Sequence, residues 1–196
     1  WLWQFDVTME PFTVIPEGRV GLVLSKDGAE IPTGNILARR VECDNFQDAD
    51  KFLSNGGQRG RQTVYITAGS YRINTMLFQV SITDMVRIQE SMVGIVTTLD
   101  GQPIEAGQIA GKLIDGHNNF QDFDSFIQNG GNRGLQPQVV LAGSYNLNPW
   151  AVQIEEIPMM EIPIGYVGVV ISYIGQEGHD LTGIDFKHGN IVQKGF

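Results

Sequence analysis

The stretch NFQDADKFLSNGGQRG, from Asn45 to Gly60, returns 74 residues later as NFQDFDSFIQNGGNRG, from Asn119 to Gly134. The likeness extends well beyond this phrase. An ungapped alignment of residues 45–101 with residues 119–175 has 24 identities in 57 positions, far more than unrelated segments share. We interpret the pattern as an internal duplication, which is the sequence signature of a repeat architecture.

A related phrase occurs three times along the chain. It reads IPEGRVGLVLSKDG, IQESMVGIVTTLDG and IPIGYVGVVISYIG, beginning at Ile15, Ile88 and Ile162. The chain opens without a methionine and stops where another NFQD-like segment is due, so we expect it to be cut from a longer protein. The repeat predicts four parts: a membrane-proximal segment 1–14, a first β module 15–87, a second β module 88–161, and the start of a third module 162–196.

Each of these phrases contains a run that predicts a strand. The runs, at residues 19–25, 92–98 and 166–172, are rich in Val and Ile and end at turn signals. Polar residues alternate only weakly in them, which predicts strands buried on both faces. The glycine inside each run indicates a β-bulge or a close approach of backbone; these glycines are Gly21, Gly94 and Gly168.

The duplicated phrase itself predicts one short helix per module, within residues 48–57 and 122–131. Acidic residues open each helix, which suits the helix dipole, and Asn-Gly-Gly ends it. The segments 62–82 and 137–157 then predict two strands around an AGSY turn, with Pro149 at an edge or a bulge. The predicted fold class is mainly β (α+β), in tandem modules that each carry one short helix.

Composition limits the classes of partner. The chain has 196 residues and a net charge of −9, so a nucleic acid is not expected as a partner, because phosphate backbones bind basic surfaces. Cys43 is the only cysteine, so no intramolecular disulfide can form, and this weakly favours a reducing compartment. No run of about 18 apolar residues is present to predict a spanning helix.

Motifs that could carry chemistry are weak. NGGQRG and NGGNRG lack the spacing of phosphate-binding loops and follow a helix rather than open one. The aspartates of the repeat lack the spacing of a calcium loop, so helix capping is the better interpretation; they are Asp44, Asp48, Asp50, Asp122 and Asp124. The histidines, His117, His179 and His188, match no zinc pattern, and Cys43 has no nearby histidine.

These observations predict a protein that is not an enzyme, with no catalytic residue, no metal and no cofactor. The glycines of the repeat are then structural, because a turn is needed in every module whereas a catalytic centre is rarely needed twice. The predicted structural turn and repeat positions are Gly56, Gly57, Gly69, Gly130, Gly131 and Gly143.

The first residues are unusually aromatic. Trp1, Leu2, Trp3 and Phe5 lie together, and aromatic clusters are enriched where a spanning helix meets the lipid headgroups. One interpretation is that a membrane anchor precedes Trp1, so that these residues are membrane-proximal. The other is that they belong to a strand in an ordinary core.

The segment VIPEGRVGLVLSKDGAEIPTGNILA, residues 14–38, resembles the start of the SPFH or band 7 family of stomatins, prohibitins and flotillins. Pro16, Gly18 and Gly21 match the V-P-x-G-x-x-G-V phrase of that family, and Pro163, Gly165 and Gly168 match it again. ITAGSYRINT and LAGSYNLNP are similar to a later phrase of band 7-like and vault-like modules. The tandem copies resemble long bacterial flotillin-like proteins most.

The resemblance implies a membrane-anchored scaffold at a plasma or inner membrane, and the single cysteine weakly favours its cytoplasmic face. Such proteins form large homo-oligomeric rings or cages that organise membrane microdomains or regulate membrane proteases. The implied partners are therefore further copies of the chain, membrane lipid through a preceding anchor, and membrane proteases. The alternative is a soluble carbohydrate-binding module with a sugar platform of aromatic side chains, namely Trp150, Tyr145, Tyr166 and Tyr173.

Overall fold

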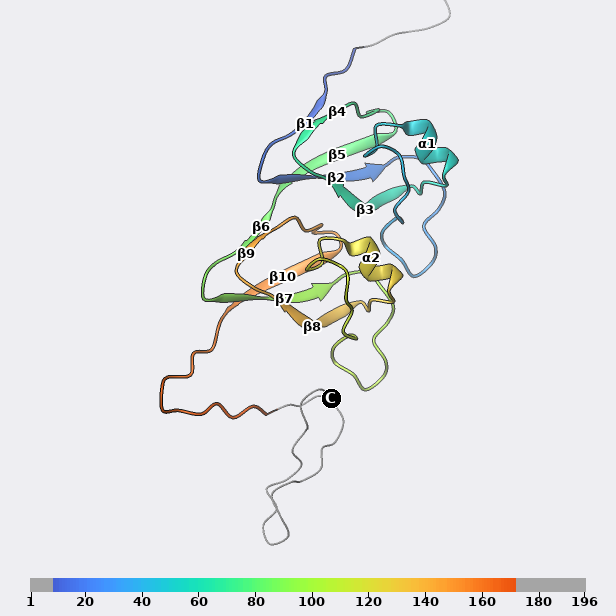
Figure 1. The fold of residues 1–196 in the computed structure, drawn as a ribbon. Coiled ribbons are helices and arrows are strands. Elements are labelled where there is room, and N and C mark those ends of the chain that lie inside the picture. The colour runs from blue at the N-terminus through green and yellow to red at the C-terminus, as the bar shows by residue number, and fades with distance from the viewer. Residues whose placement is uncertain (1–8, 172–196) are drawn as a thin grey trace, which may run out of the picture.

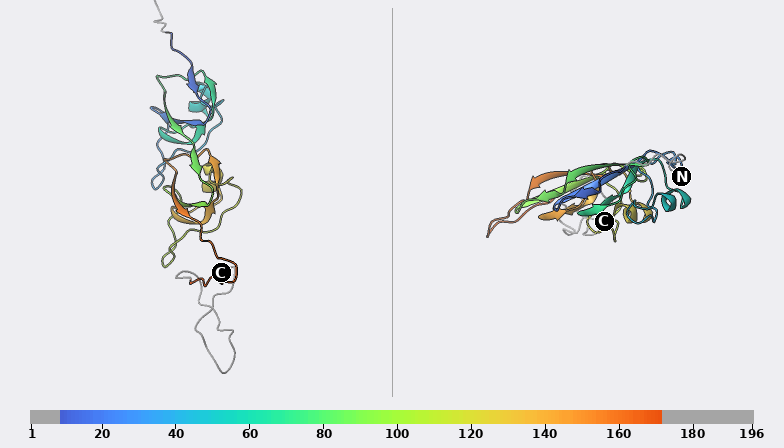
Figure 2. Two further views of the ribbon diagram at one scale, coloured as in Figure 1. Left: turned by 90° about the vertical axis from the view of Figure 1, so that its left-hand side faces the viewer. Right: turned by 90° about the horizontal axis from the view of Figure 1, so that it is seen from above.

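The computed structural model describes residues 9–171, which form two similar β-rich modules stacked one above the other in the same orientation (Figure 1). We call residues 13–84 the first module and residues 86–158 the second. Seen along the stack, the two modules nearly overlay, with both helices on one side (Figure 2). The predicted mainly β fold class with one short helix per repeat is confirmed.

The two modules contain the same elements in the same order. The first consists of β1 (Thr13–Ile15), β2 (Arg19–Ser25), α1 (Ala49–Ser54), β3 (Gly60–Ile66), β4 (Gly69–Tyr71) and β5 (Phe78–Asp84). The second consists of β6 (Val86–Ile88), β7 (Met92–Thr98), α2 (Phe123–Gln128), β8 (Gly134–Val140), β9 (Gly143–Tyr145) and β10 (Val152–Pro158). The interval between repeats is 73 residues from Thr13 to Val86 but 74 from Ala49 to Phe123, so one residue is inserted before α2.

Each module has a three-stranded antiparallel sheet and a two-stranded one. The larger sheets have the orders β3-β2-β5 and β8-β7-β10, and the smaller sheets are β1-β4 and β6-β9. The prediction that AGSY is a turn is therefore wrong in part, because Gly69–Tyr71 and Gly143–Tyr145 are strands. They pair with strands that lie more than fifty residues earlier in the chain, a long-range pairing that a local pattern does not reveal.

The glycine predicted at a bulge or close approach lies in the central strand of each larger sheet. A Cβ on Gly21 would lie 2.6 Å from Cγ1 of Ile66, and the pairing of β2 with β3 shifts register just beyond it. Gly94 is equally crowded, 2.6 Å from Cδ1 of Ile88. Burial on both faces holds for most of β2, whereas β7 alternates between buried and half-buried positions, contrary to the prediction.

Each module has its own apolar core beneath its helix. In the first module, the rings of Phe46, Phe52 and Phe78 pack together with centroids 4.9 to 6.1 Å apart. In the second, Phe120, Phe126 and the ring of His117 pack in the same way. The helices are too short to be stable alone, so their position depends on the burial of Phe52 and Phe126, which are both 0% exposed.

Two further predictions are corrected. Residues 166–171 do not form the predicted strand; Val167 and Val170 are each at least 90% exposed. The equivalent strands β2 and β7 are held by the two strands that follow them within their own module, and no such pair flanks residues 166–171 in the described part of the chain. Pro149 lies in a turn between β9 and β10, where the N–H of Ala151 donates to the carbonyl of Asn148 at 2.9 Å. Proline suits that turn because its φ is already fixed.

Candidate functional site

The helix starts are held by two of the predicted aspartates. The side chain of Asp48 accepts a hydrogen bond from the N–H of Lys51 at 2.9 Å, and Asp122 accepts from the N–H of Ser125 at 3.1 Å. Both are N-caps, as predicted. The other three predicted aspartates are not caps: Asp44 belongs to the turn that precedes the helix, and Asp50 and Asp124 lie in the first turn of their helices.

That turn is left-handed in both modules. Three consecutive residues have positive φ: Asp44, Asn45 and Phe46 at 53°, 52° and 63°, and residues 118–120 at 48°, 52° and 63°. Residues other than glycine adopt this backbone conformation at a cost of about 1–2 kcal/mol each. Residues 44–46 and 118–120, which share an Asn-Phe pair, therefore form a strained turn, and this was not predicted.

Glutamine secures the left-handed turn to the rest of its module. The Oε1 atom of Gln47 accepts a hydrogen bond from the N–H of Arg72 at 3.1 Å, and Gln121 accepts from the N–H of Asn146 at 3.0 Å. In the second module, Nδ1 of His117 also accepts from the N–H of Phe120 at 2.8 Å. Each turn places the N-cap and the first residues of its helix at the upper end of its module.

At the predicted glycines a side chain would be crowded by its surroundings or opposed by a positive φ. A Cβ on Gly57 or Gly131 would lie 2.5 or 2.2 Å from the ring of Phe52 or Phe126. Gly56 and Gly130 end the helices with φ of +76° and +84°. Gly69 and Gly143, with φ of +155° and +156°, begin β4 and β9.

The upper end of the second module is covered by the first module, and side chains of the second module bind main-chain groups of the first across this junction. Asp100, in the turn after β7, is only 4% exposed. Its Oδ2 atom accepts hydrogen bonds from the N–H groups of Ile36 and Leu37 in the first module, at 3.0 and 2.9 Å. Hydrogen bonds to an ionised acceptor are stronger than neutral ones, so this carboxylate binds the loop of the first module firmly.

Two more side chains of the second module reach across. Oδ1 of Asp124, in the first turn of α2, accepts from the N–H of Arg40 at 3.1 Å. Nδ2 of Asn148, which is 2% exposed, donates to the carbonyls of Gln62 and Thr63, each at 3.0 Å. Asp100, Asp124 and Asn148, which we call the receiving triad, thus bind five main-chain groups of the first module.

Apolar and cationic contacts complete the junction. Leu37 of the first module is 5% exposed and packs in the core of the second. The guanidinium of Arg61 lies 5.3 Å from the centre of the Trp150 ring, a cation–π contact. The two modules are therefore locked together by buried groups.

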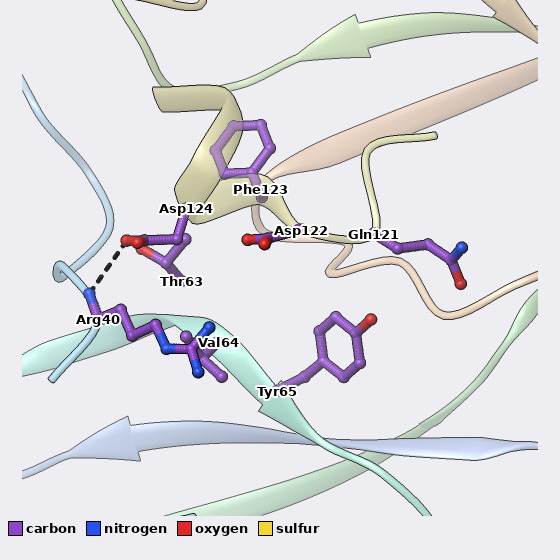
Figure 3. Close-up of a pocket in the computed structure, with 8 residues that line it drawn as sticks. All are labelled: Arg40, Thr63, Val64, Tyr65, Gln121, Asp122, Phe123 and Asp124. Atoms are coloured by element: carbon purple, nitrogen blue, oxygen red, sulfur yellow. Dashed lines mark hydrogen bonds between the residues drawn. The ribbon is translucent and has the colours of Figure 1, made fainter. Parts of the chain in front are cut away.

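A small cavity of about 190 Å³ remains between the modules, shown in Figure 3. Arg40 and Tyr65 of the first module face Asp122 and Asp124 of the second across it. Burial, followed by the nearby carboxylate of Asp122, raises the pKa of Tyr65. The cavity is smaller than the roughly 300–1,000 Å³ of typical ligand pockets, so we regard it as a packing gap of the junction.

The residues considered for metal binding or catalysis are not brought together. His117 is 3% exposed, and its Nε2 atom lies 2.8 Å from the carbonyl oxygen of Ile114. Cys43 is buried, and desolvation raises the pKa of its thiol. Within residues 9–171 there is no group of three metal-ligating side chains. The remaining candidates lie outside the described residues: Trp1, Leu2, Trp3, Phe5, Tyr173, His179 and His188.

Sequence reasoning missed Asp100 and Asn148 as site residues. A signal for both was present, because Asp27-Gly28 corresponds to Asp100-Gly101, and Asn74 corresponds to Asn148. A polar residue that recurs at a turn is explained by the turn alone. Its contact with the other module becomes visible only when the two modules are seen stacked.

No protein-family model matches the chain, and neither a curated protein nor a solved structure is detectably similar to it. Among residues 9–171, no helix combines the length and the apolar character that crossing a bilayer requires.

Proposed function

We propose that this chain is a structural scaffold that assembles into large homo-oligomers at a membrane, where it organises microdomains or regulates membrane proteins such as proteases. The observation that carries the proposal is the stacking of two equivalent modules in one orientation through a buried, charge-assisted junction. In a stack of repeats each module contacts its neighbours, and the buried hydrogen bonds here hold the two modules in one orientation.

Open strand edges support lateral assembly. β5 and β10 each pair with one strand only, so in the described part of the chain each has an edge free for hydrogen bonding. Both strands present half-exposed apolar side chains, with Ile82 45% and Ile157 37% exposed. An exposed edge is a template for pairing with another chain, and here two such edges recur at equivalent positions of the stack (Figure 1).

The membrane part of the proposal is supported by the sequence. Trp1, Trp3 and Phe5 form an aromatic cluster of the kind found at the headgroup layer. The likeness of the Pro16–Gly21 phrase to band 7 proteins points the same way.

The test is the particle size of the natural full-length protein, extracted in mild detergent and measured by light scattering after size exclusion, with images of the peak. We expect a large ring-like or cage-like particle that also sediments with liposomes. A monomer or dimer that does not sediment with liposomes would contradict the proposal.

A carbohydrate-binding module is the alternative. Of its proposed platform residues, Trp150 packs under Arg61 in the junction and Tyr145 packs against the core, while Tyr166 is 74% exposed on the segment after β10. A sugar would have to displace Arg61 to stack on Trp150. A glycan array probed with the full chain tests this alternative, and binding that is lost in Trp150→Ala would favour it.

A further inference from the structure

We propose that the upper end of the first module is a docking site for the lower end of the second module of another copy of this chain, so that chains associate head to tail. This inference goes beyond the lateral assembly proposed above and rests on a different set of contacts. The internal junction serves as its template, because the two outer ends of the stack correspond to the two surfaces that meet inside it.

The upper end of the first module carries the same receiving triad. Asp27, Asp50 and Asn74 are the equivalents of Asp100, Asp124 and Asn148, and all three are exposed. The structure therefore contains the same three residue types twice. The set in the second module binds the first module, and the set in the first module is exposed. The engaged set shows what the free set can bind, namely main-chain N–H and carbonyl groups of a module end.

Two of the three free side chains, Asp27 and Asn74, already make the local hydrogen bond that their engaged equivalents make. Oδ1 of Asp27 accepts from the N–H of Gly28 at 2.8 Å, as Asp100 does from Gly101 at 2.9 Å, which leaves Oδ2 in the place that receives Ile36 and Leu37 inside the stack. Oδ1 of Asn74 accepts from the N–H of Met76 at 3.0 Å, and Asn148 accepts from Trp150 at the same distance. Little ordering is needed on binding, and this preorganisation favours affinity.

The surface around this free triad is hollowed. An open depression of about 470 Å³ is lined by residues of the left-handed turn, the helix start and the loop after β4: Asp44, Gln47, Asp48, Ala49, Asp50, Arg72 and Asn74. In the second module, the equivalent residues Gln121, Asp122 and Asp124 line the cavity that the first module covers. The depression is thus the uncovered form of the junction.

The lower end of the second module offers the matching main-chain groups. Ile109, Ala110 and Leu113 correspond to Ile36, Leu37 and Arg40, whose N–H groups are bound inside the stack. Gln136 and Pro137 lie in the register shift between β7 and β8, as Gln62 and Thr63 lie in the shift between β2 and β3. These segments end the described stack, and the side chains of Ile109 and Leu113 are 57% and 66% exposed.

Two of the side-chain differences between the two surfaces are compatible with docking, whereas Ala110 in place of Leu37 makes the apolar contact smaller. Inside the stack, Arg61 meets Trp150. At the outer ends the equivalent residues are Leu135 and Met76, and Met76 is 83% exposed. A cation–π pair is thus replaced by a pair of apolar residues, which would bury each other. Leu113 replaces Arg40 and adds a further apolar group to the same end.

The experiment uses the 196-residue chain with each end disabled in turn. Asp27→Ala with Asn74→Ala removes the upper site, and Ile109→Asp with Leu113→Asp places carboxylates at the lower end, where they would face Asp27 and Asp50. Sedimentation equilibrium at rising concentration measures the mass. We expect the mass of the unmodified chain to rise, each variant alone to stay at the monomer mass, and the mixture of the two variants to form a heterodimer of twice that mass.

A chemical cross-link locates the contact. Met76→Cys and Leu135→Cys chains, mixed and treated with a short bismaleimide, should give a 76–135 dimer; Cys43 is buried and adds little background. Glu17→Ala, an exposed change in the loop between β1 and β2, should leave association unchanged. A mixture of the two disabled variants that stays monomeric, or the absence of the 76–135 product, overturns the proposal. Large lateral particles that persist in both disabled variants would leave the scaffold proposal standing alone.

Discussion

The two modules share one backbone plan but fill their cores differently. Cys43 of the first module is replaced by His117 in the second, and Phe78 is replaced by Val152. Phe78 lies 5.4 and 4.9 Å from the rings of Phe46 and Phe52. In the second module the His117 ring packs against the equivalent pair, at 4.2 Å from Phe120 and 5.5 Å from Phe126.

The exchange of Cys43 and Phe78 for His117 and Val152 indicates which parts of the repeat define the fold. A ring is present in the same part of both cores, but it comes from a different element in each. Volume-conserving changes of this kind are tolerated in cores. The left-handed turn, the helix caps and the crowded glycines are kept instead, so these fixed backbone features define the module, and the core can vary around them.

The largest effect is expected at Gly131. Gly131→Ala places a methyl group 2.2 Å from the ring of Phe126, and the overpacking should lower the free energy of unfolding by about 3 kcal/mol. Urea denaturation of the variant and the unmodified chain measures this loss of stability. Gly130→Ala is the control, because its Cβ has open space and only the positive φ opposes it; a loss as large as that of Gly131→Ala would show that the crowding is not the cause.

The second prediction exchanges the cores. Phe78→Val alone should cost about 2–3 kcal/mol, because it leaves a cavity beside Phe46 and Phe52. Adding Cys43→His and Val64→Gln supplies the ring and the partner that Nε2 of His117 finds in Gln138 at 2.9 Å, and we expect at least half of the loss to be recovered. Val64→Gln added alone should recover nothing. Thermal unfolding of the variants measures these changes in stability. If the three substitutions destabilise the protein additively, the idea that the ring comes from a different element in each module is contradicted.

The third prediction compares the two asparagines. Asn148→Ala removes two buried hydrogen bonds across the junction and should cost about 2 kcal/mol, since the carbonyls of Gln62 and Thr63 lose their partner. Asn74→Ala, at the exposed equivalent position, should cost less than about 0.5 kcal/mol when the chain is dilute. Amide hydrogen exchange of β3 reports the junction directly. Equal losses in both variants would mean that Asn148 acts only within its own turn.

The smallest effect concerns the bend before the central strand. Gly18 has φ of +76°, and Ser91 stands at the equivalent place with φ of +65°. Ser91→Gly should therefore raise the free energy of unfolding by about 1 kcal/mol, and Gly18→Ser should lower it by a similar amount. Chemical denaturation of both variants tests this symmetry, and destabilisation by Ser91→Gly would contradict it.

Much of the module could be predicted from local pattern. The strands β2 and β7, the two short helices with their caps at Asp48 and Asp122, and the crowding at Gly21 all follow from residue type and spacing. These features depend on a few neighbouring residues, or on the absence of a side chain, so a single stretch of sequence contains the information.

The rest depended on partners far along the chain. Gly69–Tyr71 is a strand only because Thr13–Ile15 lies beside it, and residues 166–171 are not a strand because nothing in the described chain flanks them. The left-handed turn could not be predicted either, since Asn45 and Phe46 do not demand a positive φ. The junction was hidden for a similar reason: Asp100 binds residues more than sixty positions away.

The receiving triad has a consequence for how such a chain could lengthen during evolution. All five of its hydrogen-bonding partners in the first module are main-chain groups, so these hydrogen bonds do not depend on which side chains the bound module carries. A newly copied module would then fit its neighbour from the moment of duplication, with no matching change required on the other side. Gene duplication alone could therefore extend the stack, and later substitutions such as Arg61 with Trp150 could tune each joint separately.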